Sequence, residues 1–414
     1  MKPNIVERKG NIMRRFSETR NQEEFQNKLQ AAMEEYGLDS LILTTPQNVY
    51  YATGFLSPFM YNGSCPPGTD IAVVNRTGKV SLVVGQFSQG GAEQQTKGTV
   101  EIIGYPTWIF IEDYINPNEK KKDVQPDACK TYRLAADVAR QYRDGGKVGI
   151  EAGHIPYDKY LFLQDYLGAG NLVDGTGLLT SVRAIKTPWE IDILRASAQI
   201  AERMMSYVME NTEAGMTEAD LNRMWHQSAW EFTGGHEIVY AYQAHTPGTE
   251  FWANAISRER PLEEGDIVRL DGGINLYGYL SDLGRTYAVG RKVAPERQAI
   301  FDTLLAARDA GIARMVPGTR LCDVFHTVMK VCVEGALPQY VRGHCGHSIS
   351  LGPTEEFPML SPDNEMVLRP GMVFCFETPY YSTKYNSYNL EDTLVITENG
   401  HELFTNTNRS LFIK

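Results

Sequence analysis

The sequence has few cysteines and no long hydrophobic run. Six cysteines occur among 414 residues, and no two of them have the CxxC spacing that is typical of redox and zinc sites. We therefore expect free thiols in a reducing compartment and no disulfide framework. No stretch of about 18 uninterrupted apolar residues occurs, and the first residues, MKPNIVERKGNIMRRF, contain no apolar h-region. These absences predict a cytoplasmic protein without a membrane span or a secretion signal.

Positive charge is scarce as well. The 40 Lys and Arg residues are outnumbered by 51 Asp and Glu residues, which gives a formal net charge of −11 at pH 7. A surface with this balance repels phosphate backbones and anionic lipid headgroups. The sequence therefore argues against nucleic acid and membrane surfaces as partners and favours a small-molecule substrate. With 42% hydrophobic and 22% charged residues, the composition is otherwise that of a folded globular protein.

The first part of the chain alternates strand and helix patterns. SLILTT, TDIAVVN, KVSLVVG, TVEIIGY and KVGIEA are short apolar runs typical of strands, and TYRLAADVARQY is typical of an amphipathic helix. Alternation of this kind predicts an α/β layer. The length of the chain favours about two domains, since domains average roughly 150 residues.

A second region begins with two helix-start signals. Thr187, followed by Pro188 and Glu190, forms a capping box, and Thr217 opens another helix with the same pattern. Strand-rich segments such as GDIVRLDGGIN and GMVFCFETP follow, so we place a domain boundary near residue 180. The predicted organisation is an N-terminal arm over residues 1–20, a first domain over 21–180 and a second domain over 181–414.

Five ionisable side chains stand in apolar or strand-like segments of the second region. Buried carboxylates are costly unless they are paired or bound to a metal ion. Taken alone, each of them has an ordinary explanation. Asp271 could be a turn residue, and His347 could be a core histidine with satisfied hydrogen bonds. Asp282 and Glu391 could each pair with Arg285. Two aspartates, two glutamates and a histidine together suit a pair of divalent ions such as Mn, Co, Fe or Zn. The five are Asp271, Asp282, His347, Glu377 and Glu391.

The sequence around these residues resembles a known family. Their order, within LDGGINLYGYLSDLGRTY, CGHSIS, FCFETP and LEDTLVITENG, resembles the pita-bread metallopeptidase family of methionine aminopeptidases, prolidases, aminopeptidase P and creatinase. PQNVYYATGF is similar to a segment of the creatinase/prolidase N-terminal domain, so the resemblance covers nearly the whole chain. It implies an α/β (α+β) fold in which a creatinase-like N-terminal α/β domain precedes a pita-bread catalytic domain, and it implies a homodimer.

The resemblance also implies roles for the five residues. They would hold two divalent metal ions, with manganese as one candidate, and Asp282 and Glu391 would bridge the two ions. Glu377 would be both a ligand and the base that takes the proton of the attacking water.

Three positions depart from the peptidase pattern of this family. Asn254 and Thr354 stand where its peptidases carry histidines that bind the scissile group, and Asn389 stands where prolidases carry an arginine for the substrate carboxylate. Asparagine cannot supply the charged, bidentate clamp that arginine provides. The resemblance therefore implies a metal-using enzyme whose substrate is not handled like an ordinary dipeptide.

Other candidates are less specific. His344 is either an outer partner of the metal ligands or a loop histidine. Tyr242 and His245 in EIVYAYQAH either line a substrate pocket or belong to a core or dimer interface. Glu355 and Glu356 precede a Phe-Pro pair, which is similar to the acidic residue of the dimethylsulfoniopropionate lyases of this family.

Three hypotheses about function follow. In the first, the protein is a dinuclear-metal hydrolase that attacks an amide or related C–N bond of a small molecule or Xaa-Pro-type dipeptide with metal-bound hydroxide. In the second, it is a metal-dependent lyase in which Glu355, Glu356 or a tyrosine abstracts a proton. In the third, it is a non-enzymatic binding module of pita-bread shape, which five intact ligands disfavour.

Overall fold

The computed structural model describes residues 19–107, 129–234, 238–239, 244–246, 259–406 and 409–412. The chain divides into two compact units, one over Arg20–Arg183 and one that includes Ala184–Lys414. Residues 1–18 of the predicted N-terminal arm lie outside the described residues. Among the helices that are described, none is long and apolar enough to cross a membrane.

The first unit is built on a six-stranded mixed sheet with the strand order β4-β3-β2-β1-β5-β6. β2 pairs antiparallel with both β1 and β3, and the remaining pairs are parallel. The three central strands are buried along their whole length, because helices cover both faces. The strands are β1 (Leu38–Leu43), β2 (Ile71–Asn75), β3 (Val80–Gly85), β4 (Glu101–Tyr105), β5 (Lys147–Ile150) and β6 (Leu172–Asp174).

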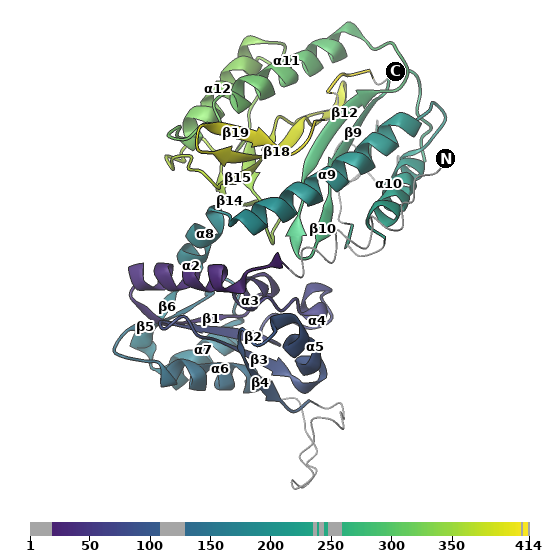
Figure 1. Ribbon diagram of the computed structural model, residues 1–414. Coiled ribbons are helices and arrows are strands. Elements are labelled where there is room, and N and C mark those ends of the chain that lie inside the picture. The colour runs from purple at the N-terminus through teal and green to yellow at the C-terminus, as the bar shows by residue number, and fades with distance from the viewer. Residues whose placement is uncertain are drawn as a thin grey trace. The chain divides into compact units, whose positions relative to one another are not determined.

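Figure 1 shows this sheet between α2 and α3 on one side and α6 and α7 on the other. Apolar residues of α6 and α7 pack with strand residues into one core. The helices are α2 (Gln22–Glu35), α3 (Pro46–Thr53), α4 (Pro58–Tyr61), α5 (Gln86–Thr96), α6 (Lys130–Gln141), α7 (Tyr157–Leu167) and α8 (Thr176–Ala184), with a 3-10 turn at Ala169–Asn171.

Four long helices form the helical part of the second unit: α9 (Pro188–Asn211), α10 (Glu218–Thr233), α11 (Pro295–Ile312) and α12 (Leu321–Glu334). Both predicted capping boxes are confirmed, since Thr187 exchanges hydrogen bonds with Glu190 and Thr217 does so with Asp220. α10 ends at Gly234, whose φ of 72° is readily adopted only by a residue without a Cβ.

The sheet of the second unit has eight strands in the order β14-β13-β15-β18-β12-β9-β8, with β19 paired to β18. All of its pairs are antiparallel. The strands are β8 (Ala244–His245), β9 (Ile267–Gly272), β12 (Leu283–Ala288), β13 (Gly346–Ser348), β14 (Glu356–Met359), β15 (Val373–Glu377), β18 (Glu391–Thr397) and β19 (Gly400–Leu403).

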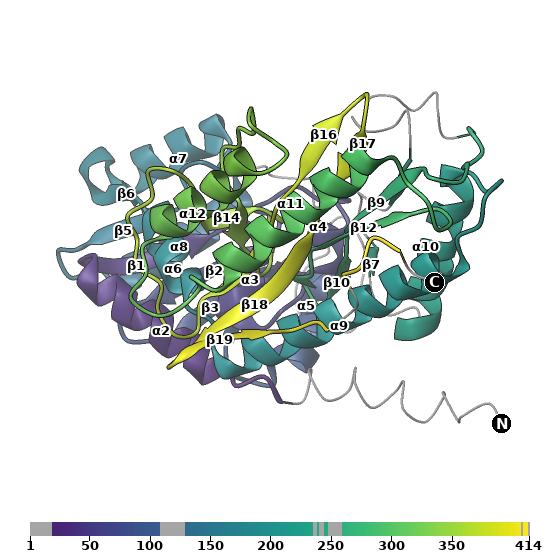
Figure 2. The ribbon, with the colours of Figure 1, turned by 90° about the horizontal axis from the view of Figure 1, so that it is seen from above.

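Helices cover one face of this larger sheet. Phe374 and Phe376 of β15 and Leu394 of β18 belong to the same core cluster as the apolar residues of α11 and α12. Figures 1 and 2 both show α11 running beside β18. Because successive side chains on a strand point to opposite faces, the residues between these apolar positions point to the other face.

Smaller β elements flank the sheet. β10 (Ile274–Leu276) pairs with β11 (Tyr279–Leu280) and with β7 (Ile238–Val239). A two-stranded ribbon of β16 (Tyr380–Ser382) and β17 (Asn386–Tyr388) contacts β9 through β17.

Candidate metal centre

The strand pairings place the predicted carboxylate ligands on one face of the larger sheet. Asp271 of β9 pairs with Gly284 of β12, Gly284 pairs with Glu391 of β18, and Glu391 pairs with Glu377 of β15. Directly paired residues point to the same side of a sheet, and so do residues two apart on one strand. Asp282, two residues before Gly284, therefore joins this face, which is opposite to the helix-covered one.

His347 completes the group from β13. It pairs with Cys375, which lies two residues before the glutamate of β15 and so points to the same face. Nδ1 of His347 lies 3.0 Å from the carbonyl oxygen of Ser348, which suits a proton on Nδ1 and leaves Nε2 free as a ligand. Nε2 lies 3.9 Å from Oδ2 of Asp282 and 3.8 Å from Oε1 of Glu391.

Three of the side chains form a group with the geometry of a metal site. One ligand atom each from Asp282, His347 and Glu391 lie within 4.8 Å of one another, and all three residues are buried. Within the part of the chain that the structure describes, Oδ1 of Asp282 and Oε1 of Glu391 have no hydrogen-bond partner. Buried carboxylate oxygens without a donor require a cation or a proton, so the donor set fits a divalent ion.

Burial also raises the pKa of these carboxyl groups. It raises the pKa of Asp282 and Glu391 well above the usual range, and the neighbouring carboxylates raise both further. It raises the pKa of Asp271 to about 6, although Arg269 opposes the shift. Four carboxyl groups this close together favour binding of positive charge, and a metal ion that binds there would displace protons.

The two outer carboxylates each have a cationic neighbour. Oδ2 of Asp271 lies 3.4 Å from Nη1 of Arg269. Oε1 of Glu377 accepts a hydrogen bond of 3.0 Å from Nη2 of Arg342, and it lies 3.3 Å from Nδ1 of His344. Burial lowers the pKa of His344, which favours its neutral form. Sequence reasoning missed both arginines, although Arg269 stands two residues before Asp271 on one strand and must share its face.

Asn389, expected at the substrate, lies directly against the ligands. Its Nδ2 donates a hydrogen bond of 3.0 Å to Oε2 of Glu391. A Cβ on Gly284 would come within 2.5 Å of this Nδ2, so a glycine is needed there for the close approach. Asn389 is 1% exposed, and it is placed to orient the carboxylate of Glu391.

Glu355 and Glu356, the two acidic candidates where the loop after β13 meets β14, differ in their surroundings. Glu356 is buried, and its carboxylate accepts hydrogen bonds from Oγ of Ser350 at 2.8 and 3.0 Å and from the backbone N–H of Gly352 at 2.8 Å. Glu355 is exposed, with Oε2 at 3.6 Å from Nε2 of His344. Glu355 is therefore the one that reaches toward the carboxylate cluster.

The structure says less about the remaining candidates. Thr354 is half-buried in the same loop. Asn254 and Tyr242 lie outside the described residues, and only the backbone of His245 is described, where it pairs with Arg269.

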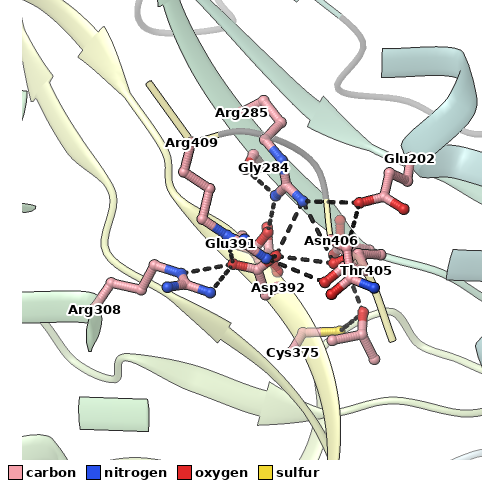
Figure 3. Close-up of polar contacts among 12 residues, drawn as sticks. Glu202, Gly284, Arg285, Arg308, Cys375, Glu391, Asp392, Thr405, Asn406 and Arg409 are labelled. Carbon is pink, nitrogen blue, oxygen red and sulfur yellow. Dashed lines mark hydrogen bonds and ion pairs between the residues drawn. The ribbon is translucent and has the colours of Figure 1, made fainter. Parts of the chain in front are cut away.

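A buried ionic cluster on the helix-covered face was not foreseen. Arg285, Arg308 and Arg409 converge on the carboxylate of Asp392, at 3.0, 2.6 and 2.6 Å, and the hydroxyl of Thr405 donates to it at 2.9 Å (Figure 3). Burial alone would raise the pKa of Asp392, but the three arginines outweigh it and hold the pKa far below the usual range. Arg285 thus pairs with Asp392 rather than with the side chains of the two ligands considered from the sequence.

Two protein-family models match the chain. The model of metallopeptidase family M24 matches residues 192–398, which is half of the chain. The model of the creatinase/prolidase N-terminal domain matches residues 26–185.

Individual relatives match over most of the chain. The Xaa-Pro dipeptidase of Pyrococcus furiosus is 22% identical over 384 residues, which cover 93% of this chain and 98% of that protein. The probable dipeptidase PepE of Mycobacterium tuberculosis is 31% identical over 260 residues, which cover 63% of this chain and 68% of that protein.

Solved structures share the architecture. The Xaa-Pro dipeptidase from Bacillus anthracis matches with a TM-score of 0.75 at 22% identity, over 95% of this chain and 100% of that one. At this identity the likeness shows the fold. Together with the family matches it confirms the expected class, a creatinase-like N-terminal α/β domain followed by a pita-bread catalytic domain.

Proposed function

Because the chain belongs to metallopeptidase family M24, we propose that it is a dinuclear-metal hydrolase that cleaves an amide or related C–N bond of a small molecule or short peptide. The observation that carries the proposal is the group of Asp282, His347 and Glu391, with its two buried carboxylate oxygens that lack a hydrogen-bond partner among the described residues. The relatives named Xaa-Pro dipeptidase support a small peptide as the substrate class.

We assign the metal ligands as the sequence predicted them. Asp282 and Glu391 would bridge two ions, with His347 and the outer carboxylates of Asp271 and Glu377 completing the two sites. When bound, divalent ions lower the pKa of water and polarise a carbonyl group, which is the chemistry that amide hydrolysis needs.

The protein's own side chains would position the reacting groups. The hydrogen bond from Asn389 orients Glu391. Arg342 holds Glu377 by a hydrogen bond to its Oε1, which leaves Oε2 to accept the proton of the attacking water.

The hydrogen bonds of Glu356 favour hydrolysis over elimination. The carboxylate of Glu356 already accepts hydrogen bonds from two donors, the hydroxyl of Ser350 and the backbone N–H of Gly352, so it is poorly placed to abstract a substrate proton. Glu355 remains the acidic residue that a lyase would use.

Metal analysis and product analysis test the proposal together. Purified protein should contain about two divalent ions per chain, and Asp282→Ala should lose most of them, because a bridging carboxylate serves both sites. Metal-loaded protein should be assayed in ¹⁸O-water with Xaa-Pro dipeptides, N-acylated amino acids and betaine- or sulfonium-type compounds. The expected result is an amine product with solvent oxygen in the new carboxylate. An alkene product, or metal content that Asp282→Ala leaves unchanged, would contradict it.

We also propose the homodimer, the cytoplasmic location and manganese as one of the ions. Sedimentation, cell fractionation and metal analysis, respectively, measure these three properties.

A further inference from the structure

Arg269 is a buried cation whose guanidinium has no hydrogen-bond partner among the described residues. The residue is 0% exposed, and within the described structure none of its three guanidinium nitrogens has a hydrogen-bond partner. Its nearest anion is Oδ2 of Asp271, at 3.4 Å. Since a buried charge without hydrogen bonds is strongly unfavourable, this arrangement points to a ligand that completes it.

Arg285, a second buried arginine of the same sheet, provides a comparison, because its guanidinium does have hydrogen-bond partners. Arg285 is 2% exposed on β12, and its Nη2 donates to the carboxylate of Asp392 at 3.0 Å and to Oγ1 of Thr405 at 3.4 Å, while Nη1 donates to backbone carbonyls. Nε alone of its three guanidinium nitrogens has no hydrogen-bond partner among the described residues. Its surroundings are built to hold a structural arginine. Around Arg269, on the carboxylate face, the described residues provide Asp271 at 3.4 Å and no hydrogen bond.

The charge of the carboxylate face leads to the same conclusion. The face carries four carboxylates, and Arg269 and Arg342 contribute two positive charges. If two divalent ions bind, as the proposed function requires, their charge balances that of the four carboxylates. The two positive charges of the arginines are then not neutralised by these groups. Glu355, whose Oε2 lies 3.6 Å from Nε2 of His344, offsets one of these two charges, so the group keeps a net positive charge, which favours an anionic substrate.

We propose that Arg269 binds a carboxylate of the substrate and thereby restricts the enzyme to acids. The planar guanidinium can hold a carboxylate through two parallel hydrogen bonds, and its position two residues before Asp271 would place the anion beside the scissile bond. The Nδ2 of Asn389 is not available for this task, because it is hydrogen-bonded to Glu391. The inference rests on the proposed function for its metal ions.

Tyr381 contacts this arginine. Its ring lies over the Arg269 guanidinium, 4.9 Å from centroid to Cζ, and the residue is 37% exposed. Rotation of this side chain, on the ribbon that follows β15, would open the guanidinium to a small anion.

Binding of matched acids and amides tests the inference without turnover. Manganese-loaded protein is titrated calorimetrically with L-proline against L-prolinamide and with N-acetylglycine against N-acetylglycinamide. The wild type should bind at least one acid more tightly than its amide, and Arg269→Met should reduce that preference by about 10- to 100-fold, the usual effect of removing a charged hydrogen bond. Arg269→Lys should retain part of it.

Two controls separate selectivity from folding and from metal loss. Metal content is measured in every variant, and Arg285→Met serves as the matched control, with lower thermal stability but an unchanged preference for acids. If Arg269→Met does not fold, Arg269→Lys carries the comparison. The inference is overturned if the wild type binds acid and amide equally or binds neither, if the Arg269 variants keep the full preference, or if Arg285→Met loses it equally.

The same experiment distinguishes failure of this inference from failure of the proposed function. Preference for acids through Arg269 without any hydrolysis would overturn the proposed function and keep the anion site. Hydrolysis with the KM for acid substrates unchanged in Arg269→Met would overturn the anion site alone.

Discussion

Asn389 donates a hydrogen bond of 3.0 Å from its Nδ2 to Oε2 of Glu391, so the residue expected to contact substrate is bonded to a predicted metal ligand. This bond leaves Oε1 of Glu391 directed toward His347. A short amide so close to the ligand can fix the rotamer of this carboxylate.

Removing that amide should weaken metal binding. We expect Asn389→Ala to reduce metal affinity by about 10- to 100-fold, because outer hydrogen bonds that orient ligands have this effect in other metal sites. Competition with a chromophoric chelator measures the affinity. Asn364→Ala is the matched control, since its Nδ2 binds only the backbone carbonyl of Met359, away from the carboxylates. Equal affinities for wild type and Asn389→Ala would contradict the orienting role.

Glu377→Gln should separate metal binding from chemistry. Glutamine keeps the size of the side chain and one oxygen donor but cannot accept the proton, so metal should be partly retained while turnover falls by about 10²- to 10⁴-fold. Glu355→Gln is the control, because Glu355 is exposed and should leave hydrolysis nearly unchanged. Near-normal turnover in Glu377→Gln together with a large loss in Glu355→Gln would favour the lyase instead.

Asp392→Asn should destabilise the second unit. Loss of the charge leaves three buried arginines without their common anion, and breaking a buried pair costs about 3–5 kcal/mol. Asp309→Asn is the control, because Arg308 also pairs with this exposed residue and such pairs contribute about 0–1 kcal/mol. Urea unfolding of the metal-loaded proteins measures both changes.

The pH dependence of the stability difference between wild type and Asp392→Asn provides a further check on Asp392. Its pKa is lower in the folded than in the unfolded chain, so its contribution is present above the unfolded value of 3.8 and is lost as the pH falls through the lower folded value. The stability difference between wild type and Asp392→Asn should therefore narrow below about pH 4. A difference that widens in acid would refute the assignment.

Metal removal should give the carboxylate cluster a pH dependence opposite to that of Asp392: the free energy of unfolding should fall as the pH rises. The folded pKa is raised to about 6 for Asp271 and is raised well above the usual range for Asp282 and Glu391, so the folded metal-free protein binds protons more tightly than the unfolded chain. Their protonation stabilises the fold fully below the unfolded values of 3.8 and 4.5, and this stability is lost as the pH rises through 6 and above.

Thermal unfolding at pH 5 and pH 8 measures this effect. Chelator-treated wild type should lose more stability between these pH values than metal-loaded protein, and metal-free Asp282→Asn should show a weaker dependence, because one of the repelling carboxylates is gone. An equal change in thermal stability between pH 5 and pH 8 in metal-loaded wild type, metal-free wild type and metal-free Asp282→Asn would argue against a coupled carboxylate cluster.

Local signals in the sequence were sufficient for much of this protein. The helix starts at Thr187 and Thr217 follow from capping chemistry, which involves residues only three positions apart, and the structure contains both. The five candidate ligands stood out because ionisable residues in apolar strands need a partner. Their resemblance to a known family pointed to the fold, which the comparisons confirm.

Strand pairing determined the rest, because it joins residues that are distant in the sequence. Glu391 and Asp392 are neighbours with similar side chains, yet alternation along β18 directs one to the carboxylate cluster and the other to three arginines behind the sheet. Likewise, no local pattern distinguishes Arg285, whose charge is satisfied, from Arg269, whose guanidinium has no hydrogen-bond partner among the described residues. Which face a strand residue occupies, and what lies across from it, depends on register and on the packing of helices and ribbons around the sheet.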